Sequence, residues 1–216
     1  MGEIDHDLTI GLAVLQVKDL HFSYGPEPLF TGLSLRIPPG ISLVRADDGF
    51  GKSTLLRLLA GTLQPKSGQL LINGVDINAN LDHYKAQIFW AEPRADSHDQ
   101  LTVQEYFELQ RRNYAGFSAA VLAEVVSGLS LSEHLHKQLF MLSTGSKRKV
   151  FIAAAFASGA ALTLLDTPFA ALDAPSTDFI LNWLHSSAAA DQRAWVIADY
   201  TARDGLPLVQ VIDLGE

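Results

Sequence analysis

The sequence predicts an α/β fold with a mostly parallel core sheet, an antiparallel β layer and an inserted α-helical lobe. Three observations support this class. Helical and strand patterns alternate from residue 146 onward, which implies right-handed crossovers between parallel strands. Strand patterns joined by tight turns fill residues 12–91, and a helical stretch separates the two parts. With 216 residues, 48% of them hydrophobic, the chain is long enough for the core of one domain.

The strand patterns of the N-terminal part predict the antiparallel layer. Asn73 and Gly74 form a pair that favours a two-residue hairpin turn. We therefore expect residues 12–45 and 69–77 to share one antiparallel sheet. The strand patterns of this part cover residues 12–20, 34–37, 41–44, 69–74 and 86–91.

The helical lobe is predicted at about residues 93–142. Thr102 and Glu105 have the spacing of a capping box, in which each side chain accepts a backbone N–H of the other residue. The helical patterns cover residues 102–113, 118–129 and 131–137. We expect one domain over residues 1–216, in which 1–92 and 143–216 form the core and the β layer.

Beyond the lobe, helices alternate with strands. Residues 150–165 contain no charged side chain, but the run is shorter than the roughly 20 residues that a membrane-spanning helix needs. Ser158 and Gly159 also divide it into an alanine-rich helix and a short buried strand. We predict no transmembrane segment. The patterns are helical at 146–158 and 176–190 and extended at 161–165, 195–198 and 208–212.

The loop 46–54 fits the phosphate-binding pattern G-x-x-x-x-G-K-[ST], with Ala46 in place of the first glycine. Backbone N–H groups of residues 49–53 can surround a β-phosphate, and the start of the following helix adds partial positive charge. Lys52 can reach the β- and γ-phosphates, and the Ser53 hydroxyl can bind Mg²⁺. The alternative, a glycine turn with a surface lysine, is disfavoured because a strand precedes the loop and a helix follows it. We predict a nucleoside triphosphate site.

A second motif supports this prediction. Asp166 ends the apolar strand pattern 162–166, and a carboxylate in that place orients Mg²⁺ or its waters beside a phosphate-binding loop. Alone the pattern is weak, because many core strands end in an aspartate. Together the two motifs are a strong signal.

Composition excludes other classes of function. The net charge of -8 and the absence of a stripe of lysine and arginine argue against nucleic acid as a partner. The chain has no cysteine, which excludes disulfides and thiolate metal sites and fits a reducing cytosol. His134 and His136 lie two residues apart, on different faces of a helix, so they are not a metal-ligand pair.

In their order along the chain these motifs resemble the ATP-binding cassette (ABC) family, and the short single cassette looks most like small bacterial exporter-type members. Residues 46–54 correspond to Walker A, 162–166 to Walker B, 171–173 to the D-loop and, imperfectly, 142–146 to the LSGGQ signature. The resemblance implies that Tyr24 stacks on adenine and that Gly49, Gly51, Lys52, Ser53 and Thr54 bind ATP. It assigns Mg²⁺ to Ser53, Glu92 (at the position of the Q-loop glutamine) and Asp166. Ser143 and Gly145 would contact the nucleotide of a partner cassette.

Two departures from the family pattern concern hydrolysis. Thr167 stands where the family places the glutamate that acts as general base, and Tyr200 stands where it places the switch histidine. Neither side chain accepts a proton usefully at neutral pH. Since a general base contributes about 10²–10⁴ in rate, we expect no intact catalytic residue and impaired hydrolysis. Whether this chain is an enzyme stays open.

Three further positions bear on binding. Ala46 would be strained if its φ were positive, and an inward carboxylate of Asp47 or Asp48 would repel phosphate by about 3 kcal/mol. Because Lys52 and Asp166 persist, we expect ATP affinity to be reduced but not lost. Ser143 fits equally well as the N-cap of the helix that follows it.

The resemblance implies an ATP-binding subunit that pairs with a second cassette, more readily a different chain than a copy, and with separate transmembrane subunits. We expect it in the cytoplasm on the inner face of the membrane. A groove beside Glu92, with Phe89, Trp90 and Leu101, would receive the membrane partner. The alternatives are a non-hydrolysing sensing or scaffolding cassette and a weakly active homodimeric ATPase with Glu92 or Asp199 as base. The transported substrate and its direction stay open.

Overall fold

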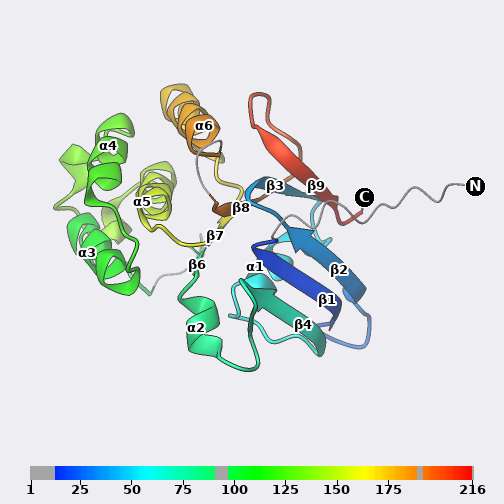
Figure 1. The fold of residues 1–216 in the computed structure, drawn as a ribbon. Coiled ribbons are helices and arrows are strands. Elements are labelled where there is room, and N and C mark those ends of the chain that lie inside the picture. The colour runs from blue at the N-terminus through cyan, green and yellow to red at the C-terminus, as the bar shows by residue number, and fades with distance from the viewer. Residues whose placement is uncertain (1–12, 91–96, 189–191, 216) are drawn as a thin grey trace, which may run out of the picture.

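The computed structural model describes residues 13–90, 97–188 and 192–215 (Figure 1). A parallel sheet lies between two layers. The helix α1 (Lys52–Leu59) and an antiparallel sheet cover one face, and the helices α5 (Thr144–Ala157) and α6 (Ala174–Ala188) cover the other. The predicted fold class is confirmed.

The antiparallel sheet has the strand order β2-β1-β4-β5. The turn between β4 and β5 uses Asn73 and Gly74, whose φ angles of 46° and 79° suit a two-residue hairpin, as the sequence predicts. Its strands are β1 (Leu15–Phe22), β2 (Phe30–Ile37), β4 (Ser67–Ile72) and β5 (Val75–Asp76).

The second sheet is parallel throughout, with the order β6-β7-β8-β3-β9. The prediction that residues 41–44 belong to the antiparallel layer is wrong, because β3 lies between β8 and β9. The sequence of β3 is apolar on both faces and its first five residues are buried, which suits a strand covered on both sides. The strands are β3 (Gly40–Arg45), β6 (Ile88–Trp90), β7 (Leu162–Asp166), β8 (Ala194–Asp199) and β9 (Leu208–Asp213).

The two faces of the parallel sheet have separate cores. On one face the leucines of α1 pack between β8 and the antiparallel sheet. On the other, Trp195 of β8 packs with Phe156 of α5 and Trp183 of α6, and the rings of Phe156 and Trp183 stack at 3.8 Å. Both cores fix the carboxyl ends of β3, β7 and β8 beside one another, where ligands bind in α/β folds.

The helical lobe follows β6 and contains α3 (Val103–Asn113) and α4 (Ala119–Gly128). The predicted capping box at Thr102 and Glu105 is present. The predicted helix at 131–137 is wrong: only the 3-10 turns η1 (Ser132–His134) and η2 (Leu139–Met141) form in this part of the lobe. The carbonyls of Leu135 and Lys137 accept hydrogen bonds from the N–H groups of Gln104 and Val103 at the start of α3. These bonds take the place of the hydrogen bonds that a helix in this segment would form.

The short helix α2 (Leu81–Lys85), which is not among the predicted elements, connects the antiparallel sheet to β6. Asn80 caps it by accepting the N–H of His83, a signal that was readable in the sequence. In the described ranges no helix is both long enough and apolar enough to cross a membrane.

Candidate nucleotide site

The loop between β3 and α1 offers an open start of a helix. Gly49 and Gly51 have φ angles of 86° and 92°, which favour glycine, and a Cβ on Gly51 would lie 2.9 Å from the ring of Phe30. No side chain of the described residues caps α1 at Gly51. The first N–H groups of a helix lack partners within it, so those of α1 remain available to an anion. This arrangement fits a phosphate group.

The strain expected at Ala46 is absent. Ala46 is not among the residues with a positive φ, and its side chain is buried. Asp47 and Asp48 are both exposed, but Oδ1 of Asp48 accepts a hydrogen bond from the hydroxyl of Tyr200, whose ring lies over Lys52, so this carboxylate faces the side of the loop on which Lys52 lies. The backbone at the first position of the pattern therefore does not require the positive φ that favours glycine.

Lys52 lies at the centre of the loop and is 7% exposed. Its Nζ donates hydrogen bonds to the carbonyl oxygens of Ala46 and, at 2.8 Å, Asp47. The ring of Tyr200 lies over the same Nζ, 4.2 Å from centroid to nitrogen. The ammonium group is thus held beside the helix start by three neighbours.

The two predicted metal-binding side chains that the structure describes lie together. The Ser53 hydroxyl donates to Oδ2 of Asp166 at 2.6 Å, although 113 residues separate them. A hydroxyl and one carboxylate suit Mg²⁺, which takes its other ligands from phosphate and water. Across the ranges that the structure describes, no cluster of three histidine, cysteine or acidic side chains offers a fuller metal site. Glu92 lies outside the described residues.

Tyr24 lies beside the first turn of α1. Its hydroxyl is 3.2 Å from Oγ1 of Thr54, and its ring meets Phe22 edge-on at 4.9 Å. The side chain is 67% exposed, so one face of the ring is free to stack on a flat ligand. Thr54 is buried, and its hydroxyl faces Tyr24.

Thr167 directly follows Asp166 and has a φ of 43°, an uncommon conformation for a β-branched residue. Its backbone N–H donates to the carbonyl of Ala198 in β8 at 2.8 Å, which ties the ends of β7 and β8 together. The threonine hydroxyl brings no proton acceptor of useful pKa to this position.

Tyr200 follows β8 and bridges to the phosphate-binding loop. Its hydroxyl donates to Oδ1 of Asp48 at 2.7 Å, across 152 residues of sequence. The bond to Asp48 and the negative charges of Asp48, Asp199 and Asp166 raise the pKa of Tyr200, so the phenol stays protonated at neutral pH. No local sequence pattern predicts this bridge, because it depends on how the ends of β3 and β8 align.

Ser143 and Gly145 of the signature segment (residues 142–146) have roles inside the chain. Ser143 caps α5 by accepting the N–H of Ser146 at 3.1 Å. A Cβ added to Gly145 would lie 2.3 Å from the carbonyl oxygen of Ala171, so only glycine fits there. Both observations explain these residue types without a second chain.

Two cationic side chains connect α5 to the segment after β7. Lys149 pairs with Asp173 at 2.6 Å, and Arg148 donates to the carbonyl of Ala170. Asp173 also accepts the N–H of Ser176 at the start of α6. The hydrogen bond from Lys149 is the largest cause that lowers the pKa of the Asp173 carboxyl, which therefore stays ionised.

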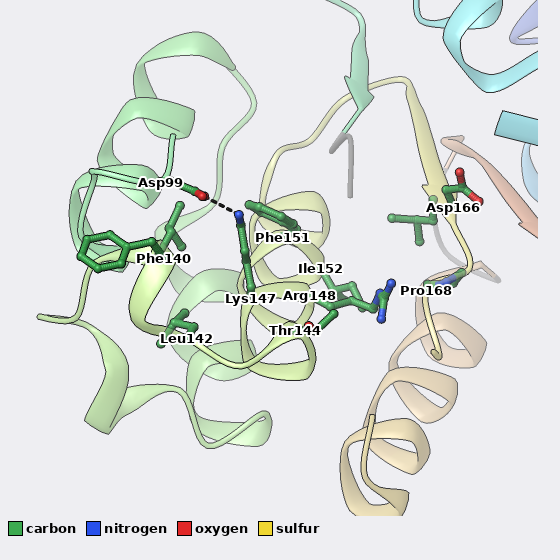
Figure 2. Close-up of a pocket in the computed structure, with 12 residues that line it drawn as sticks. Asp99, Phe140, Leu142, Thr144, Lys147, Arg148, Phe151, Ile152, Asp166 and Pro168 are labelled. Carbon is green, nitrogen blue, oxygen red and sulfur yellow. Dashed lines mark hydrogen bonds and ion pairs between the residues drawn. The ribbon is translucent and has the colours of Figure 1, made fainter. Parts of the chain in front are cut away.

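A cavity of about 250 Å³, not anticipated from the sequence, lies between the lobe and the end of β7 (Figure 2). Figure 2 shows Lys147 reaching Asp99 at one end and Arg148 extending toward Pro168 at the other. Phe89, predicted to contact a membrane partner, is buried in the core, so that assignment is wrong. Trp90 and Leu101 are partly exposed.

A parallel sheet, a glycine loop opening a helix, and a serine–aspartate pair at the carboxyl ends of strands define a P-loop nucleotide-binding domain. The model of the ABC transporter family matches residues 31–170. The chain belongs to this family, and its domain is an ATP-binding domain.

Curated relatives agree. The chain is 33% identical over 161 residues to a cytochrome c biogenesis ATP-binding export protein CcmA of Legionella pneumophila. The matched region covers 74% of this chain and 80% of the relative. It is 36% identical over 188 residues to the cobalt import ATP-binding protein CbiO of Rhodobacter capsulatus, covering 82% and 66%. A putative ABC transporter ATP-binding protein of Pyrococcus furiosus shares the fold, with a TM-score of 0.75, 22% identity and coverage of 93% and 96%.

Proposed function

We propose that this chain is the ATP-binding subunit of an ABC transporter, that it holds Mg-nucleotide in its P-loop (residues 46–54), and that its own site is impaired in hydrolysis. The observation that carries this proposal is a contrast within one site. Lys52, Ser53 and Asp166 stand in a binding arrangement, whereas Thr167 and Tyr200 occupy the positions of the base and the switch residue.

The binding residues have separate roles. The N–H groups of residues 49–53 and the Lys52 ammonium hold phosphate oxygens, and Tyr24 stacks on the base. Ser53 and Asp166 would hold Mg²⁺, with Glu92 as a further ligand. The bound metal would supply charge neutralisation at the phosphates. Thr167 cannot remove a proton from an attacking water, so cleavage at this site is slow.

We place the subunit in a dimer with a second cassette, a heterodimer in preference to a homodimer, associated with transmembrane subunits on the cytoplasmic face of a membrane. Ser143 and Gly145 would complete the partner's nucleotide site, where turnover would occur. The names of the relatives include both export and import.

Binding and phosphate release measured on one preparation of the purified chain test the proposal. We expect saturable MgATP binding without phosphate release above that of buffer. Removal of Mg²⁺ with EDTA should weaken binding, because the Ser53–Asp166 pair then loses its ion. Turnover of about 1–10³ s⁻¹, the usual range for enzymes, would contradict impaired hydrolysis.

The main alternative is a scaffolding cassette without nucleotide. Complete failure to bind ATP and ADP, with a folded protein by circular dichroism, would favour it. A weakly active homodimer with Glu92 or Asp199 as base is a second alternative, because Asp199 is a carboxylate at the end of β8, next to Tyr200. Slow turnover that Asp199→Asn abolishes would support that alternative.

A further inference from the structure

The hydrogen bond between Tyr200 and Asp48 lies beside Lys52, at the part of the P-loop that the terminal phosphate of a nucleotide would approach. In a P-loop the lysine ammonium meets the β- and γ-phosphates. Here the Lys52 Nζ has two carbonyl oxygens on the loop side, and the face of the Tyr200 ring lies over it at 4.2 Å. A terminal phosphate oxygen would need hydrogen-bond contact with the same nitrogen, at about 2.8 Å.

The Tyr200 ring is held in this position from both ends. At its backbone, the N–H of Tyr200 donates to Oδ1 of Asp199 at 2.8 Å. At its tip, the hydroxyl donates to Oδ1 of Asp48 at 2.7 Å. The side chain is 46% exposed, so displacing it would break the Asp48 bond without opening the protein core.

Charge acts in the same direction. The negative charges of three carboxylates near the Tyr200 hydroxyl raise its pKa: those of Asp48, Asp199 and Asp166. A γ-phosphate entering there would add negative charge among three carboxylates, of which only Asp166 is placed to share a cation with Ser53. A β-phosphate, by contrast, would lie at the N–H groups of residues 49–53. This part of the loop is open, since a Cβ added to Gly49 would have no described atom within 4 Å.

We propose that Tyr200 and Asp48 form a latch over the γ-phosphate position, so that this site selects a nucleoside diphosphate over a triphosphate. The latch rests on the proposed nucleotide-binding function and adds ligand selection to it. Triphosphate can bind only when the Tyr200–Asp48 bond breaks and the ring leaves Lys52. Diphosphate binds with the latch closed, because the N–H groups of residues 49–53 can hold its β-phosphate without a hydrogen bond from Lys52.

Equilibrium titration of the full chain with ADP and with ATP, both with Mg²⁺, tests the latch. The wild-type chain should bind ADP roughly tenfold or more tightly than ATP. Tyr200→Ala should bring the ratio of the two affinities close to one, mainly by improving ATP binding. Tyr200→Phe, which keeps the ring and loses the bond, and Asp48→Asn, which keeps an acceptor and loses the charge, should give intermediate ratios.

Tyr24→Ala is the matched control, because this tyrosine lies at the opposite end of the nucleotide and should weaken ADP and ATP equally. Tyr200→His replaces Tyr200→Ala if the alanine variant does not fold by circular dichroism, and the same ratio near one is expected. If the wild-type chain binds ADP and ATP with equal affinity, and neither Tyr200→Ala nor Asp48→Asn changes the ratio of the two affinities, the latch alone is overturned. Failure of every variant to bind either nucleotide would overturn both the latch and the proposed function.

Discussion

On the P-loop side of the site, Lys52 and Ser53 stand at an open helix start beside Asp166, whereas on the strand-end side Thr167 and Tyr200 stand at the tips of β7 and β8. The first side keeps residue types that bind phosphate and Mg²⁺. The second side has a strained threonine and a tyrosine bonded to Asp48 in place of proton acceptors. Under the proposed function, the residues that hold the nucleotide are not the residues that would activate water, although Asp166 and Thr167 are neighbours at the end of β7. One role can therefore be lost without the other.

The largest effect is expected on the P-loop side. Lys52→Met should weaken binding of ADP and ATP by about 10- to 100-fold, because the buried positive charge beside the phosphates is removed. Lys18→Met removes an exposed lysine of β1 and is the matched control. Equal affinities of the Lys52→Met variant and the wild-type chain, by isothermal titration, would mean that the P-loop side does not hold the nucleotide.

The backbone of the P-loop should be the next most sensitive feature. Gly51→Ala forces a positive φ on alanine and places a Cβ 2.9 Å from the Phe30 ring, so we expect a loss of about 1–3 kcal/mol in the free energy of unfolding. At Gly49, where φ is also positive but the space is open, alanine should cost less. Urea unfolding of the two variants measures the difference, and equal losses would contradict the crowding at Gly51.

Ser143 has a structural role in this chain, as the N-cap of α5, and a proposed role in the nucleotide site of a partner, but none in the nucleotide site of its own chain. Ser143→Ala should cost about 1 kcal/mol in the free energy of unfolding, because α5 loses its N-cap, while the nucleotide affinity of this chain stays unchanged. Ser143→Asp restores a capping acceptor and should recover most of the stability. A drop in the chain's own nucleotide affinity with Ser143→Ala would show that the signature segment also affects the P-loop of the same chain.

The smallest effect is expected at Thr167, and it has the opposite sign. Thr167→Asn should raise the free energy of unfolding by about 0.5–1 kcal/mol, because asparagine tolerates a positive φ better than a β-branched residue does. Nucleotide affinity should not change. A thermal melt detects the shift, and a lower melting temperature would mean that the threonine side chain makes contacts that outweigh the backbone strain.

The sequence predicted those parts of the site and fold that depend on local pattern. The loop 46–54 and the capping box at Thr102 were readable because each lies within a few residues. The pairing of Asp166 with the loop was expected from the chemistry of P-loops, in which a carboxylate at a strand end shares Mg²⁺ with the loop, and the resemblance to a family supports it. The hairpin at Asn73 and Gly74 was readable for the same local reason.

The features that the sequence did not predict are long-range. The Tyr200–Asp48 bond joins the ends of β8 and the P-loop, and no local pattern pairs these residues. The helix expected at 131–137 fails because carbonyls of that segment bond to the start of α3. The strand β3 was assigned to the wrong sheet because a buried apolar run does not say which neighbours cover it.

The measurement that tests the contrast most directly is phosphate release from MgATP by the Thr167→Glu, Tyr200→His double variant beside the wild-type chain. We predict no release above buffer for the wild-type chain and a rate about 10²–10⁴-fold higher for the double variant, since a general base is restored. Turnover by the wild-type chain at the rate of an ordinary enzyme, or a double variant that binds ATP and hydrolyses it no faster, would contradict the account.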